Sequence, residues 1–80
     1  MKYRYENLYD YTDLLERIKL LGLTQDAVAR KIGIDPATFS QKIHGKSLFT
    51  QLEMDETCRV LNIEPSKVHI YFLKRKLLKN

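Results

Sequence analysis

The sequence predicts an all-α fold, a compact bundle of about five helices that forms one domain over residues 1–80. Three observations favour this class. Apolar residues recur three or four positions apart, as on one face of a helix. Residue types that cap helix N-termini precede these runs, and the three glycines follow them. A single cysteine cannot cross-link so small a chain, so the core must form by side-chain packing.

The first two helices are predicted between cap and glycine signals. The first begins at Thr12, whose hydroxyl can accept a hydrogen bond from the first turn, and ends before Gly22. The second begins after Thr24 and ends before Gly33. Their inner faces comprise Leu14, Leu15, Ile18 and Leu21 in the first helix, and Val28, Ala29 and Ile32 in the second.

The third and fourth helices have stronger start signals. The third is predicted from Pro36 to about His44, because Asp35 is an N-cap residue and proline fits the first helical position. The fourth begins after Thr50, which can form a capping box with Glu53. The residues expected on its buried face are Met54, Cys58 and Leu61.

Residues 65–79 are predicted to form a fifth helix, although Val68–Phe72 also has good strand propensity. On a helix, Ile70, Leu73 and Leu77 would lie three and four positions apart on one apolar face. We expect this face to be the interface of a homodimer. The alternative is a helix that packs wholly into its own domain.

Charge is unevenly distributed along the chain, whose net charge is +4. Residues 24–47 hold four cations and two carboxylates, residues 48–64 one cation and four carboxylates, and residues 65–80 five cations and no carboxylate. This pattern suggests one face turned toward a polyanion and another turned away. A solvated surface with a basic tail is the alternative on charge alone.

The residues that could carry chemistry are too few for an enzyme. His44, His69 and Cys58 do not stand at the paired short spacings of a zinc site. The glycines are separate helix ends rather than a phosphate-binding loop. We therefore expect no catalytic residue, cofactor, metal or small-molecule ligand. No apolar stretch is long enough to span a membrane and the N-terminus lacks a secretory signal, so the expected location is the cytoplasm, without membrane contact.

Residues 24–45 carry the most informative pattern, two short helices joined by a glycine turn. Ala29 is small enough for the helices to cross closely, Gly33 supplies the positive φ of a tight turn, and Phe39 can anchor the second helix. The region resembles the helix-turn-helix signature of lambda-repressor-like regulators of the xenobiotic-response-element type, which it matches at Gln25, Ala29, Gly33 and Phe39. The resemblance extends from Leu14 to Ile63 and points to short Cro- or repressor-type regulators of phages and prophages of Gram-positive bacteria.

The resemblance implies that the second helix of this motif enters the major groove of duplex DNA. The base-contacting set that it implies, with Lys42 as an addition, is Pro36, Ala37, Thr38, Gln41 and Lys42. The phosphate-contacting set is Gln25, Arg30, Ser40, His44, Lys46 and Ser47. Gln41 can pair with adenine and Lys42 with guanine. Plain solvent exposure is the alternative for these positions.

Two features stand at the edges of the resemblance. The family has an apolar residue three positions after the one matched by Phe39, whereas this chain has Lys42 there and Ile43 next, which leaves open a rotation of the last turn. At the N-terminus, Lys2 and Arg4 form either an arm that reaches the duplex or a frayed end.

The sequence therefore predicts a sequence-specific regulator of transcription that binds double-stranded DNA, a repressor of the phage or prophage Cro type that acts by occupying its operator. A homodimer would place two recognition helices about 34 Å apart and would prefer an inverted-repeat operator. The alternative is a protein-interaction module on the same fold, such as an antitoxin or a partner of another regulator, because a fold alone does not decide function.

Overall fold

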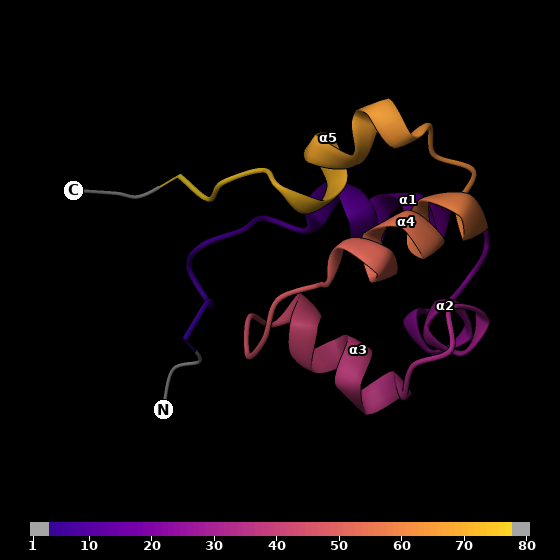
Figure 1. The fold of residues 1–80 in the computed structure, drawn as a ribbon, viewed down its shortest axis with the longest axis horizontal. Coiled ribbons are helices and arrows are strands. Elements are labelled where there is room, and N and C mark those ends of the chain that lie inside the picture. Colours follow the sequence, from indigo (N-terminus) through magenta and orange to yellow (C-terminus); the bar gives the residue numbers. More distant parts are fainter. Residues whose placement is uncertain (1–3, 78–80) are drawn as a thin grey trace.

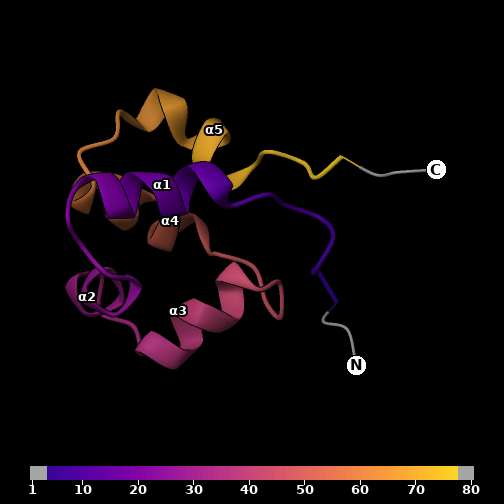
Figure 2. The same ribbon diagram turned by 180° about the vertical axis from the view of Figure 1, so that it is seen from behind.

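The computed structural model describes residues 4–77. Within them the chain forms α1 (Thr12–Leu20), α2 (Gln25–Lys31), α3 (Pro36–Ile43), α4 (Gln51–Val60), the 3-10 helix η1 (Pro65–Lys67) and α5 (Val68–Phe72). Helices α1 and α4 lie between α5 on one side and α2 and α3 on the other (Figures 1 and 2). This all-α bundle confirms the predicted fold class. None of the helices within residues 4–77 is long and apolar enough to cross a membrane.

Three of the predicted helix starts are confirmed by their cap hydrogen bonds. Thr24 Oγ1 and Asp35 Oδ1 accept from backbone N–H groups in the first turns of α2 and α3, at 3.1 and 3.2 Å. At α4, the backbone N–H of Thr50 donates to Glu53 Oε1 at 2.9 Å, and Thr50 Oγ1 accepts from the Glu53 N–H at 3.1 Å. The capping box therefore satisfies two backbone groups that the helix itself leaves unpaired.

The predicted cap of α1 is wrong. Thr12 is the first residue of the helix, and the N-cap position is Tyr11, whose side chain makes no cap hydrogen bond. Asp10 Oδ1 instead accepts from the backbone N–H of Thr12 at 2.9 Å. Hydrogen bonds from Thr12 lower the pKa of Asp10, with smaller contributions from the charges of Lys74 and Lys76.

An aromatic cluster joins the helices at the centre of the core. The buried ring of Phe49 makes edge-to-face contacts with Tyr11, Phe39 and Phe72, at centroid distances of 5.3, 5.5 and 5.1 Å. Phe49 lies in the loop before α4, so one loop side chain connects α3 and α5 with the N-cap residue of α1. Aromatic pairs in this geometry stabilise a core beyond the area they bury. Cys58 and Leu61 of the predicted α4 face are buried, and Met54 is half-buried.

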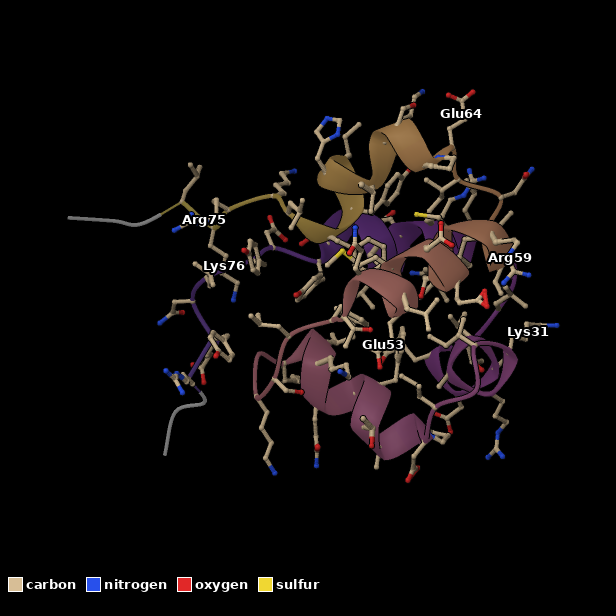
Figure 3. The ribbon with its side chains drawn as sticks, viewed as in Figure 1. Lys31, Glu53, Arg59, Glu64, Arg75 and Lys76 are labelled. Carbon is tan, nitrogen blue, oxygen red and sulfur yellow. The ribbon has the colours of Figure 1, made fainter. Side chains whose placement is uncertain are left out.

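The C-terminal element differs from the prediction. It is helical only to Phe72, and the predicted continuation toward residue 79 is wrong from Leu73 onward; residues 78–80 lie outside the described residues. Residues 74–76 instead pair antiparallel with residues 8–10, through Asp10 N–H to Lys74 O at 2.7 Å and Lys76 N–H to Leu8 O at 3.1 Å. Figure 3 shows Arg75 and Lys76 of this pairing outside the helical bundle.

Candidate functional site

The candidate site is the exposed face of α2 and α3, the two short helices of the predicted motif. Helices α2 and α3 pack against each other, and residues 32–35 connect them. Ala29 is fully buried at the contact, and Phe39 anchors α3 with 0% of its side chain exposed. Gly33 has φ +80° with no atom near the position of a Cβ, so its backbone conformation, rather than crowding, requires glycine there.

The exposed side of α3 presents uncharged side chains to solvent. Ala37 and Gln41 are exposed, and Pro36 and Thr38 are half-buried. Ala37 and Gln41 stand four positions apart, so they lie on the same side of the helix. The structure thus brings together four members of the predicted base-contacting set.

The predicted placement of Lys42 on this face is wrong. Its side chain is buried, and the ammonium group lies 2.9 Å from Glu53 Oε1 and donates to Leu48 O at 2.9 Å. Figure 3 shows Glu53 on α4, above α3. The stem of Lys42 takes the inward position that an apolar residue has in the resembled family, while its charged end finds two oxygen partners. The capping-box glutamate was visible in the sequence, but its pairing with Lys42 was not.

The contribution of Glu53 to the stability of the fold depends on pH because of this pairing. Burial raises its pKa, but hydrogen bonds from Thr50 and Lys42 and the charge of Lys42 outweigh burial, so the pKa is lowered from its ordinary value of 4.5. A carboxyl group whose pKa is lower in the folded state stabilises the fold fully above its unfolded pKa. That contribution disappears as the pH falls through the folded-state pKa.

The double variant Lys42→Met with Glu53→Gln is expected to keep the fold and to lose less stability in acid than the wild type. Glutamine can still complete the capping box, and replacing both members of a buried ion pair is often close to neutral. Urea unfolding at about pH 7 and about pH 3.5 measures the difference. The control is Lys42→Met alone, which leaves Glu53 without its ion-pair partner and is expected to be destabilised at neutral pH. An unchanged acid dependence in the double variant would contradict this role of the pair.

The residues predicted to contact phosphates lie on α2 and at the end of α3 and just beyond it. Arg30, His44 and Lys46 are exposed, whereas Gln25, Ser40 and Ser47 are half-buried. Residues 24–47 hold three exposed cations, at positions 30, 31 and 46, and two exposed carboxylates, at positions 26 and 35. With Lys42 paired internally, this surface carries only a weak positive charge.

One ring nitrogen of His44 is engaged in a hydrogen bond within the chain. Nδ1 lies 2.8 Å from the backbone carbonyl of Ser40, which can only accept, so the neutral ring carries its proton on Nδ1. The remaining Nε2 then has no proton to donate. A hydrogen bond from His44 to a phosphate oxygen therefore requires the protonated ring.

The N-terminal segment packs against the end of α3, a contact that the sequence did not predict. The backbone N–H of Tyr5 donates to Gly45 O at 2.8 Å, and Gly45 is buried under Tyr5 and Glu6. Arg4 is exposed, with its guanidinium 5.5 Å from the centroid of the Tyr5 ring, and Lys2 lies outside the described residues. No local signal could reveal this contact, because it joins segments about forty residues apart.

The predicted dimer face does not exist as a helical stripe. Ile70 lies in α5, but Leu73 is its C-cap and Leu77 lies in the extended segment beyond it. The three side chains are exposed, by 39%, 43% and 96%. The homodimer itself stays a prediction.

These features define a small all-α protein in which a tight turn joins the packed helices α2 and α3. The chain belongs to the family described as "Protein of unknown function (DUF739)", whose model matches residues 7–75. Its structure is similar to the solution structure of the modulator of repression (MOR) of the temperate bacteriophage TP901-1 from Lactococcus lactis, with 30% sequence identity and a TM-score of 0.71. The similarity covers 88% of this chain and 95% of that chain. No curated relative matches the chain. Membership of the lambda-repressor-like family stays a prediction.

Proposed function

We propose that this chain is a regulator that modulates repression in a phage-type genetic switch, and that it acts through the exposed face of α2 and α3. Similarity to the modulator of repression over nearly the whole of both chains supports the regulatory role. The buried anchor Phe39 supports the choice of surface, because it holds α3 at the edge of the bundle with one side in solvent (Figure 1).

Duplex DNA is the first target that we propose for this face. The observation that carries it is the exposure of Ala37 and Gln41 on one side of α3, with Lys46 exposed just beyond its end. Alanine can pack on a thymine methyl group, and glutamine can form two hydrogen bonds with adenine. Lys46 would neutralise a phosphate and position the helix.

Two substitutions separate base contacts from phosphate contacts. Lys46→Ala is expected to weaken binding to all duplexes similarly and to reduce the log–log salt slope by about 1. Gln41→Ala is expected to relax the preference at one base pair, by about 1–3 kcal/mol, with little change in the slope. Electrophoretic shifts of duplexes selected from a random pool, at several salt concentrations, measure both effects. The exposed Lys19 on α1, as Lys19→Ala, is the charge-matched control.

Another regulatory protein is the second candidate target. Two observations favour it: Lys42 is unavailable for guanine, and exposed Asp26 and Asp35 reduce the positive charge of the face. If this candidate holds, the purified chain shifts no duplex at low salt, yet changes how much repressor occupies an operator when it is added to a repressor–operator complex. Direct binding of duplexes that Gln41→Ala alters at one base pair would reject it.

A further inference from the structure

We propose that the groove between the start of α4 and the η1–α5 segment binds a basic amphipathic helix of another protein. This site is independent of the α2–α3 face, because α5 lies on the far side of α1 and α4 from α3 (Figures 1 and 2). The groove has a volume of about 450 Å³ and is lined by Gln51, Met54, Asp55, Pro65, Val68 and Leu73.

Apolar surface continues from the groove around the start of α4. Leu52 is 70% exposed and, with Gln51 and Asp55, lines a second hollow of about 390 Å³. Leu73, at the other end of the groove, is 43% exposed. The two hollows adjoin, because Gln51 and Asp55 line both. Exposed apolar side chains gathered in this way are typical of interaction sites, and the flexible side chain of Met54 can adapt to an apolar partner.

The charges around the groove determine the chemistry of the partner. Asp55 is the one charged side chain that lines the groove. Two neighbouring carboxylates on α4 are paired, Glu56 with Arg59 and Glu53 with Lys42. Asp55, in the groove, has no ion-pair partner among residues 4–77. Glu64 lines a separate hollow, together with Arg17 and Lys67. An apolar floor with the Asp55 carboxylate beside it complements a helix whose apolar stripe is flanked by lysine or arginine.

The basic run at residues 74–76 does not supply such a helix from a second copy of the chain. The basic residues 74–76 are extended rather than helical, and they are paired with residues 8–10 of their own chain. Lys74 also forms an ion pair with Asp13, with 3.1 Å between Nζ and Oδ2. Nucleic acid and anionic membranes are disfavoured by the negative charge of Asp55 in the groove. A different protein with a basic helix, the chemistry that DNA-binding proteins display, is the occupant that fits.

The site can be tested on the full chain with a synthetic helical peptide of roughly 14 residues, about four turns. The peptide carries leucine at positions i, i+3, i+4 and i+7 and lysine on its flanks, and a second peptide has glutamate in place of lysine. In an NMR titration, the basic peptide is expected to shift the amides of Met54, Asp55 and Val68 and to leave those of α3 unchanged. The acidic peptide is expected not to bind.

Charge reversal at the groove then tests the assignment. Asp55→Lys is expected to weaken binding of the basic peptide about tenfold, because one attraction becomes a repulsion. Asp26→Lys makes the same charge change at an exposed position of α2 and is expected to have no effect. A melting curve verifies that each variant is folded. Absence of binding, shifts confined to α3, or equal effects of the two variants would overturn the proposal. None of these outcomes bears on duplex binding by α3, which the DNA experiments measure separately.

Discussion

Replacing Phe39 with alanine is expected to lower the free energy of unfolding by about 3–5 kcal/mol. The ring is fully buried and lies 5.5 Å from the centroid of Phe49 in an edge-to-face contact. Its removal leaves a cavity under α3 and deprives Phe49 of one of its three aromatic neighbours. For a domain of this size, such a loss is a large fraction of a total stability of about 5–15 kcal/mol.

Denaturant unfolding monitored by circular dichroism measures this loss. Gln41→Ala, on the same helix but exposed, is the matched control and is expected to change stability by no more than about 0.5 kcal/mol. If Phe39→Ala leaves the unfolding midpoint where the wild type has it, the ring does not anchor α3, and the position of the exposed face must be reconsidered.

The features that the sequence predicted correctly depend on short stretches of chain. The caps at Thr24, Asp35 and Thr50 act on backbone groups within three residues, and the turn at Gly33 depends on its own φ angle. Such signals can be interpreted without knowing what packs around them. They were sufficient to place α2, α3 and α4, and with them the candidate face.

The features that the sequence missed depend on residues far apart in the chain. Lys42 can be buried because its ammonium group pairs with Glu53 on α4 and donates to Leu48 O in the preceding loop, whereas the residue type alone predicts exposure. The helix over residues 65–79 stops at Phe72, where backbone groups of the next residues pair with residues 8–10 instead. Tertiary hydrogen bonds override the helical preference of this segment. The basic run Lys74–Lys76 does not stabilise a helix, because it places like charges next to one another.

Substituting Gly45 with alanine is expected to destabilise the fold more than the same substitution at Gly33. Both glycines have positive φ, +88° and +80°, so both substitutions carry the strain of a left-handed residue, about 1–2 kcal/mol. At Gly33 the new methyl group meets open space. At Gly45 it lies 2.6 Å from the Cα of Glu6 and 2.7 Å from the carbonyl carbon of Tyr5, both backbone atoms that cannot rotate away.

The N-terminal segment must therefore move when Gly45 becomes alanine, and the hydrogen bond from Tyr5 N–H to Gly45 O is lost with it. The expected result is a lower unfolding midpoint than that of Gly33→Ala, together with faster amide hydrogen exchange at Tyr5. Because residues 8–10 hold residues 74–76, we also expect faster exchange at Lys76, whose N–H donates to Leu8 O. Equal stability of the two variants, with Tyr5 protected in both, would mean that the segment does not pack against the end of α3 in solution.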